Sequence, residues 1–166
     1  MQGSTPCTEW NVQAWILHNI KVAGFAAGVL EENITVNPTD VEGAIPGGDP
    51  VKALDDSVAK VLETIRASGS VDKQISTPFG DMTRGQFLVN PAWHLLMHNW
   101  DLAKGTGQDA TTDSGLVQLA HNTVYPQADA MREMDFGGGH IIGSRIQVPA
   151  DASRQDQLLG AFGRRP

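Results

Sequence analysis

Apolar residues recur at steps of three and four along much of the chain, and this spacing predicts amphipathic helices. The first such segment is residues 11–30, whose apolar face is broad, and the second is residues 50–67. Pro50 suits the first turn of a helix because its missing N–H would have no partner there. Between the two segments, the Pro- and Gly-rich residues 37–50 predict a loop.

The helical period is lost over residues 69–84, where ISTPFGDMT predicts a short extended excursion with a turn. The third helix is expected to begin at Asn90 as N-cap with Pro91 in its first turn, and to stop at Gly105. Residues 83–89 are then a preceding turn, which the proline separates from the helix.

A fourth helix is predicted over about residues 113–134, broken or bent at Pro126. A flexible loop at GGGH, an extended segment or short strand at residues 145–149, and a short helix within residues 153–166 complete the chain. The expected fold is mainly all-α: a small helical bundle with a short extended C-terminal segment.

Composition narrows the class of protein. The chain has 166 residues, enough for one domain with a real core, so residues 1–166 are predicted to form a single domain. A net charge of −7 and a pI near 5.0 argue against nucleic-acid or anionic-membrane partners. One cysteine, Cys7, excludes an intramolecular disulfide and fits a reducing compartment. With no membrane span or signal peptide recognised, the expected location is cytoplasmic.

The sequence HLLMH places His94 and His98 one helical turn apart, so both rings can point at one metal ion. Neutral imidazole binds zinc, nickel, copper or iron, but two ligands make a poor site. Because no Glu follows His94, the metalloprotease pattern HExxH is absent.

His18, midway along the first predicted helix, is a candidate third ligand. A lone helical histidine is more often a packing or surface residue. Three buried imidazoles on facing helices would leave polar nitrogens unsatisfied, and one metal ion would satisfy all three. His121 and His140 fall outside this pattern and are assigned to surface or loop positions.

Other residues near this pattern have candidate roles. Asp101 could accept the second ring N–H of a metal-bound histidine, or could have an exposed polar or capping role near the helix end. Arg145 could bind a substrate carboxylate, or could be a solvated arginine. Cys7 is either a buried small residue or a fourth ligand that closes the site. Three tryptophans could either line the pocket or pack in the core: Trp15, Trp93 and Trp100.

Three separated stretches lie in order along nearly the whole chain. They are TPCTEWNVQAWILH, HNWDLAKGTGQD and SRIQVPADASRQDQLLGAFGRRP. Together they resemble motifs of the actinobacterial metal-binding proteins related to the N-terminal domain of mycothiol-dependent maleylpyruvate isomerase, within the DinB-like superfamily. The resemblance implies a four-helix bundle that holds one divalent metal, usually zinc or nickel, through His18, His94 and His98.

Two departures from that family bear on the prediction. Many relatives carry Glu where this chain has His94, and the lost negative charge should make the metal a stronger Lewis acid. Relatives also have a whole helix before the TPC motif, whereas this chain starts almost at the motif. A bundle lacking that helix would expose apolar surface, so a homodimer is expected.

Three protein ligands leave a coordination position open, as in catalytic metal sites. In the family resembled, this position takes a low-molecular-weight thiol, such as mycothiol or bacillithiol, and the metal lowers the thiol pKa. The expected function is a divalent-metal-dependent thiol S-transferase or isomerase acting on a small molecule. The alternatives are a metal-dependent hydrolase, a metal-binding module without turnover, and a remnant whose histidines only pack.

Overall fold

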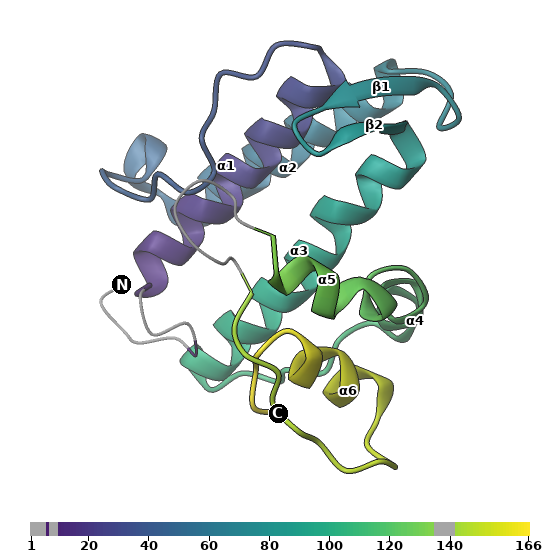
Figure 1. Cartoon of the computed structure of the whole chain (residues 1–166). Helices are drawn as coiled ribbons and strands as arrows, with labels where there is room; N and C mark the ends of the chain where they lie inside the picture. Colours follow the sequence, from purple (N-terminus) through teal and green to yellow (C-terminus); the bar gives the residue numbers. More distant parts are fainter. Residues whose placement is uncertain (1–5, 7–9, 135–141) are drawn as a thin grey trace. The chain divides into compact units, whose positions relative to one another are not determined.

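The computed structural model describes residue 6, residues 10–134 and residues 142–166, and the protein is mainly helical, as predicted (Figure 1). Its contacts divide the chain into two compact units, Met1–Asp109 and Ala110–Pro166. Two such units are compatible with one domain or with two, so the single domain stays a prediction. Within the described residues, no helix is both long and apolar enough to cross a membrane.

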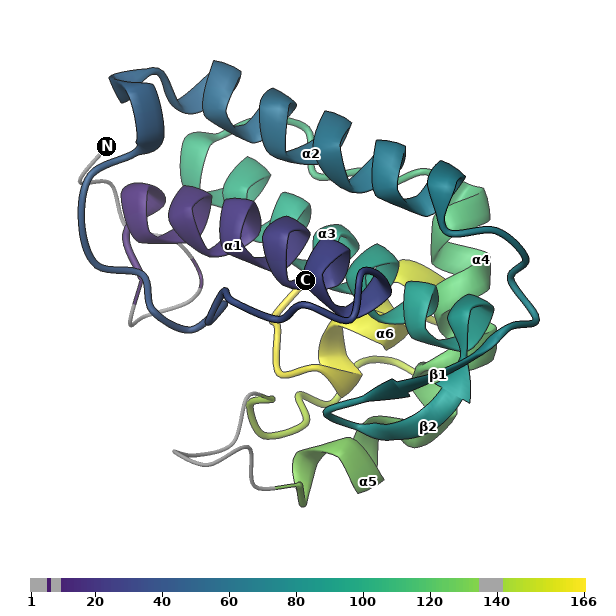
Figure 2. The same ribbon diagram turned by 90° about the horizontal axis from the view of Figure 1, so that it is seen from above.

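The first unit contains three long helices and a β-hairpin. α1 packs against both α2 and α3, and Figure 2 shows the three helices side by side. The two strands pair antiparallel, with Gln74 opposite Thr83 and Thr77 opposite Gly80. The elements of this unit are α1 (Val12–Leu30), a 3₁₀ turn (Pro46–Gly48), α2 (Pro50–Ala67), β1 (Gln74–Thr77), β2 (Gly80–Thr83) and α3 (Arg84–Thr106).

Among the residues that the structure describes, two apolar clusters hold this unit together, one towards each end of α1. Both consist of buried side chains from elements far apart in the sequence, so they fix α1 against its neighbours. The first cluster is Trp15, Ile16, Leu17, Ile45 and Ala53. The second is Ala26, Val29, Leu30, Ile75 and Phe87.

The first two helices begin where the sequence predicts. Asn11 caps α1, because its side-chain oxygen accepts a hydrogen bond from the Ala14 N–H at 2.9 Å. Asp49 caps α2 by accepting from the N–H groups of Val51 and Lys52, and Pro50 occupies the first turn. The predictions for both helices and for the extended excursion that follows are confirmed.

The predicted start of the third helix is wrong, because α3 begins at Arg84 and Pro91 lies inside it. Thr83 and Gln86 form a reciprocal capping box, and Thr83 lies about two turns before the proline. The N–H groups of Arg84 and Gly85 also donate to carbonyls of the chain before β1, so the first turn is well satisfied. A proline in a helix removes one backbone hydrogen bond. The hydrogen bonds made at the start of α3 compensate for the one lost at Pro91.

The end of α3 lies slightly beyond the predicted stop at Gly105. The helix runs to Thr106, and Gly107 follows with φ 70°, in the left-handed region that glycine adopts without strain. α3 is therefore longer than predicted, and its histidines lie well inside a continuous helix rather than near its first turn.

The chain between α1 and α2 turns back along α1 (Figure 2). Residues 33–45, hereafter the return segment, pass close to the helix, and the approach is closest at Gly28, which explains this poor helix former inside α1. A Cβ atom at Gly28 would lie 2.8 Å from the Asn33 carbonyl oxygen, whereas one at Gly24 would meet only the Val36 side chain, at 3.4 Å. Ile45 anchors the far end in the first apolar cluster.

The second unit contains α4 (Ser114–Thr123), a 3₁₀ turn (Tyr125–Gln127), α5 (Ala128–Arg132) and α6 (Arg154–Ala161). The predicted break at Pro126 and the predicted terminal helix are both confirmed. Residues 143–149 have no regular secondary structure, although the Ile146 N–H donates to the Gly160 carbonyl at 2.9 Å. The predicted GGGH loop lies outside the described residues.

Substituting the two α1 glycines separately tests the close approach of the return segment. Gly28→Ala should lower the free energy of unfolding by about 1–3 kcal/mol, because backbone atoms must move to admit the methyl group. Gly24→Ala should be neutral, or should stabilise by up to about 1 kcal/mol through better helix propensity. Urea unfolding of both variants measures the difference, and equal effects would contradict the close approach.

Candidate metal centre

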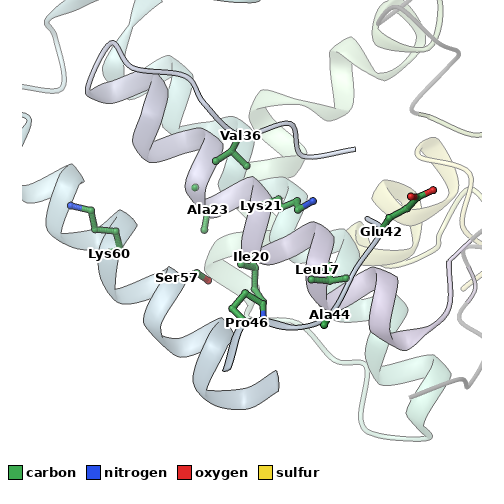
Figure 3. Close-up of a pocket in the computed structure, with 11 residues that line it drawn as sticks. Leu17, Ile20, Lys21, Ala23, Val36, Glu42, Ala44, Pro46, Ser57 and Lys60 are labelled. Carbon is green, nitrogen blue, oxygen red and sulfur yellow. The ribbon is translucent and has the colours of Figure 1, made fainter. Parts of the chain in front are cut away.

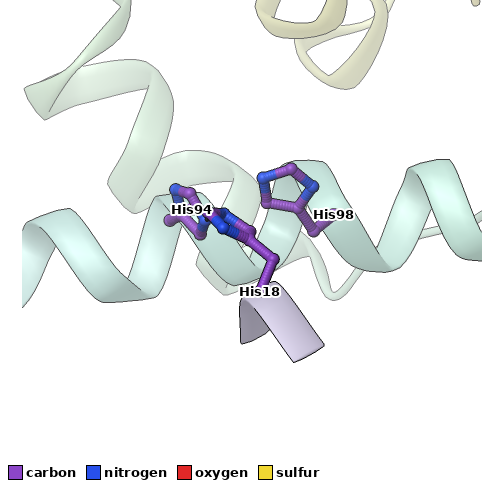
Figure 4. A group of neighbouring side chains, drawn as sticks. All are labelled: His18, His94 and His98. Carbon is purple, nitrogen blue, oxygen red and sulfur yellow. Dashed lines mark hydrogen bonds between the residues drawn. The ribbon is translucent and has the colours of Figure 1, made fainter. Parts of the chain in front are cut away.

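Three histidines from two helices meet in the first unit (Figure 4). His18 comes from the middle of α1, while His94 and His98 come from successive turns of α3. Their candidate ligand nitrogens all lie within 4.8 Å of one another. The Nε2 atoms of His18 and His94 are 2.7 Å apart. The structure thus brings together all three residues that the sequence pattern selects, and metal binding by them stays a prediction.

The donor set fits a divalent transition metal. Zinc–imidazole bonds of about 2.0–2.1 Å in tetrahedral geometry separate neighbouring nitrogens by about 3.3 Å. The ring nitrogens here span distances from 2.7 Å to within 4.8 Å, so small side-chain rotations bring them to that separation. Three neutral nitrogens with no carboxylate or thiolate among them favour zinc, nickel or copper over magnesium or calcium.

Burial keeps His18 in the neutral form that metal binding requires. His18 is only 5% exposed and His98 only 6%, while His94 is half-buried. Burial, and secondarily the charge of His98, lower the pKa of His18 to about 4, against the opposing effect of its hydrogen bond to Pro38. At neutral pH, His18 is therefore an uncharged imidazole, and no proton has to be removed from it before coordination.

A hydrogen bond orients the ring of His18, and a carboxylate lies close to the ring of His98. The His18 Nδ1–H lies 2.6 Å from the Pro38 carbonyl oxygen and donates to it, which leaves the lone pair of Nε2 directed at the other histidines. Nδ1 of His98 lies 3.4 Å from a carboxylate oxygen of Asp101. Histidines that bind metals commonly direct their second nitrogen at a carbonyl or a carboxylate in this way.

Asp101 occupies the position expected of a residue that supports a metal ligand. It is 0% exposed and lies one turn after His98 on α3, so the alternative of an exposed residue near the helix end is wrong. A carboxylate at this depth needs a positive or hydrogen-bonding partner, and an imidazole that gains positive character on binding a metal provides one.

Tryptophan rings surround the histidines. Trp15 lies edge-on to His98 at 6.3 Å between ring centroids, and Trp93 lies edge-on to His94 at 5.9 Å. Both are buried, so they serve the core and the site together. Trp100 is buried as well, and its ring carries the Lys104 ammonium at 5.2 Å.

Trp10 is a site residue that the sequence reasoning missed. Its ring centroid lies 4.3 Å from that of His18 and 5.9 Å from that of His98, and it is half-buried. Its position at the end of TPCTEW, just before the capping residue Asn11, was the available signal. With three tryptophan rings around them, the histidines lie in surroundings of low polarity, where charge interactions are strong.

Arg145 belongs to the second unit, where Asp129 accepts hydrogen bonds from it at 3.1 Å. Its guanidinium also lies 5.9 Å from the centre of the Tyr125 ring. Arg132 and Arg145 together lower the pKa of Asp129. A substrate role for Arg145 stays a prediction, and its observed partner is this carboxylate.

The structure describes one of the three remaining candidate residues, His121. His121 is half-buried, stacks on Tyr125 at 4.5 Å and lies 3.1 Å from the Gln157 side-chain oxygen, so it is a packing residue of the second unit. Cys7 and His140 lie outside the described residues.

A cavity of about 530 Å³ opens beside α1, and none of the described histidines lines it (Figure 3). It lies between α1, α2 and the return segment. Its walls are mostly apolar, so it is separate in both position and chemistry from the metal centre. Its lining includes Leu17, Ile20, Lys21, Val36, Pro46 and Lys60.

Comparison with known proteins gives relatives without a described function. No family model matches the chain, and no solved structure matches it. Two proteins of Mycobacterium tuberculosis, one from strain CDC 1551 / Oshkosh and one from strain ATCC 25618 / H37Rv, are each 28% identical to it. Both matches cover 98% of this chain and 84% of the relative, and both relatives are called uncharacterized. The predicted family membership and the predicted homodimer stay predictions.

The pKa of His18 predicts how the stability of the metal-free protein depends on pH. Its folded-state pKa of about 4 lies below the ordinary value of 6.5, so the folded state binds fewer protons than the unfolded state between these values. The contribution of His18 should be fully present above pH 6.5 and should be lost as the pH falls towards 4, by up to about 3 kcal/mol.

The measurement is chemical unfolding of the wild type and of His18→Asn between pH 4 and pH 8, with a chelator present. Asn keeps an N–H donor for the Pro38 carbonyl but does not titrate. The difference in unfolding free energy between the two proteins should shrink as the pH is lowered. A difference that does not change with pH would contradict the assignment.

Proposed function

We propose that this protein is a divalent-metal-dependent enzyme that activates a low-molecular-weight thiol for S-transfer or isomerisation. The observation that carries the proposal is the convergence of His18, His94 and His98, two of which are buried and oriented by groups outside the cluster. The resemblance to the DinB-like metal-binding proteins supports it, and so does the helical fold. Zinc and nickel are the metals proposed.

Three side-chain ligands distinguish this arrangement from a closed structural site. Structural zinc is almost always held by four protein ligands, whereas catalytic zinc keeps one position for water or substrate. Within the described residues, the candidate ligand group contains three side chains. A metal bound here would supply a Lewis acid that lowers the pKa of a thiol or a water at neutral pH.

The protein's own residues would provide positioning and a dry environment. The Pro38 carbonyl would hold His18 in the orientation that presents Nε2, and the Asp101 carboxylate, 3.4 Å from Nδ1, would do the same for His98. The tryptophans Trp10, Trp15 and Trp93 exclude water from the ring faces, which strengthens the interaction between a metal and an anionic sulfur. A thiolate formed at neutral pH is the nucleophile that both proposed reactions need.

The first test is the metal content of protein purified without a histidine tag. One equivalent of zinc or nickel is expected, and His18→Ala and His98→Ala should each abolish stoichiometric binding. His121→Ala is the matched control, because this histidine lies outside the cluster and should leave the metal content unchanged. Metal-free wild type, or equal loss in the control, would contradict a metal centre formed by the three histidines.

Metal binding should also stabilise the fold. At a free metal concentration one hundred times Kd, the gain in unfolding free energy is about 2.7 kcal/mol. Unfolding with and without a chelator measures this gain in wild type and in His98→Ala, where it should disappear. An unchanged midpoint in the wild type would instead favour histidines that only pack.

A thiol titration separates the enzyme from a binding module without turnover. In cobalt-substituted protein, adding cysteine, mycothiol or bacillithiol should produce a sulfur-to-cobalt charge-transfer band in the near ultraviolet. A thiol-dependent loss of an electrophilic substrate should accompany it. A spectrum that no thiol changes would favour the binding module, and activity without thiol would favour a hydrolase.

A further inference from the structure

His18 has to adopt one of its two neutral tautomers to bind a metal through Nε2, because the proton must then be on Nδ1. The group that selects this tautomer is a backbone carbonyl, that of Pro38, 2.6 Å from Nδ1. The position of a backbone carbonyl depends on the conformation of the chain around it. The conformation of the return segment therefore determines which nitrogen of His18 is presented to the cluster.

The carbonyl belongs to a turn with strong local preferences, Asn37–Asp40. Asn precedes Pro, which is a favoured start for a turn, and the Asn37 side-chain oxygen accepts hydrogen bonds from both the N–H and the hydroxyl of Thr39, at 3.0 Å and 2.8 Å. The Asp40 N–H also lies 3.4 Å from the Asn37 carbonyl oxygen. The turn is thus defined by its own residues, but these bonds do not fix it to α1.

Lys21 supplies that attachment. Its ammonium donates to the Asp40 carboxylate at 2.8 Å and to the Asp40 backbone carbonyl. His18 and Lys21 are three residues apart on α1 and so lie on one face of the helix. The turn is held at two points one helical turn apart: its proline carbonyl accepts from His18, and its last residue is bound by Lys21.

We infer that Lys21, Asn37 and Asp40 are positioning residues of the metal centre. They hold the Pro38 carbonyl where it fixes the Nδ1–H tautomer and the ring orientation of His18. If Lys21 or Asp40 is lost, the turn can leave α1, and the proton of His18 can move to Nε2. A protonated Nε2 cannot bind a metal. The inference rests on the proposed metal centre and extends it to residues that touch no metal.

The experiment compares Lys21→Met and Asp40→Asn with Asp56→Asn. The control breaks the exposed Lys52–Asp56 pair on α2, which is likewise a lysine–aspartate ion pair but joins residues four apart in one helix, away from the turn. Zinc affinity is measured by competition with a chromophoric chelator. Loss of a partner that orients a metal-bound histidine typically weakens binding by 10- to 100-fold, so about a tenfold loss is expected in Lys21→Met. A smaller loss is expected in Asp40→Asn, because its backbone carbonyl and amide oxygen still accept from Lys21. The control should bind zinc as the wild type does.

Two further readouts distinguish positioning from a general loss of structure. The ¹⁵N chemical shifts of the histidine rings in metal-free protein report the tautomer of His18: Nδ1–H in the wild type, and a mixture in Lys21→Met and Asp40→Asn. Lys21→Arg keeps a donor for Asp40 and should restore both the tautomer and the zinc affinity. The melting temperatures of the metal-free test variants should match that of the control.

The outcomes separate this inference from the proposed function. If the wild type binds no zinc, the metal centre is wrong, while the tautomer shifts still decide whether the turn positions His18. If the wild type binds zinc and the test variants keep both its affinity and its tautomer, the positioning role is overturned and the metal centre stands. Weaker binding with an unchanged tautomer also overturns it.

Discussion

The arrangement of the first unit depends on how a buried cluster of imidazoles satisfies its nitrogens. A buried polar atom without a partner costs about 1–3 kcal/mol, and three rings together carry six nitrogens. The protein directs one nitrogen of His18 to a backbone carbonyl and one of His98 towards a carboxylate, and it places Nε2 of His18 2.7 Å from Nε2 of His94. A metal ion bound by the three rings would give these imidazole nitrogens a shared partner.

This requirement connects features that look unrelated in the sequence. Gly24 and Gly28 weaken α1 as a helix, yet Gly28 lets the return segment pass within contact distance of the helix backbone. The return segment carries Pro38 to His18 and Ile45 into the first apolar cluster. α1 is therefore shaped for the close approach of the return segment as much as for packing against its neighbouring helices.

α3 contributes rigidity. Because the helix begins at the Thr83–Gln86 capping box and continues past Pro91, His94 and His98 lie inside a long, continuous element. Phe87 fixes its first turns in the second apolar cluster. Binding residues on such a helix keep their spacing without help from loops, whereas His18 depends on the return segment for its orientation.

The relatives found by comparison have no described function, so the functional proposal rests on the site itself. A helical fold does not select a reaction, and the same architecture can serve unrelated activities. What narrows the choice here is the donor set: three imidazoles, low exposure and tryptophan rings. This set suits a transition metal that keeps a position for a further ligand.

The sequence by itself determined the helices with strong periodicity and clear caps, namely α1 and α2, and the break at Pro126, because these depend on neighbours in the chain. It also selected the three histidines, since a four-residue spacing places two of them on one helix face. It misplaced the start of α3, because Pro91 indicated a first turn there, whereas the Thr83–Gln86 capping box starts the helix earlier.

Only the tertiary structure decided the rest. The approach of His18 to the other histidines, the burial of Asp101, the position of Trp10 and the carbonyl of Pro38 against a ring nitrogen all join residues far apart in the chain. Periodicity shows which face of a helix is apolar, but not which face of another element will meet it. Those pairings depend on the packing of the whole unit, which no local pattern encodes.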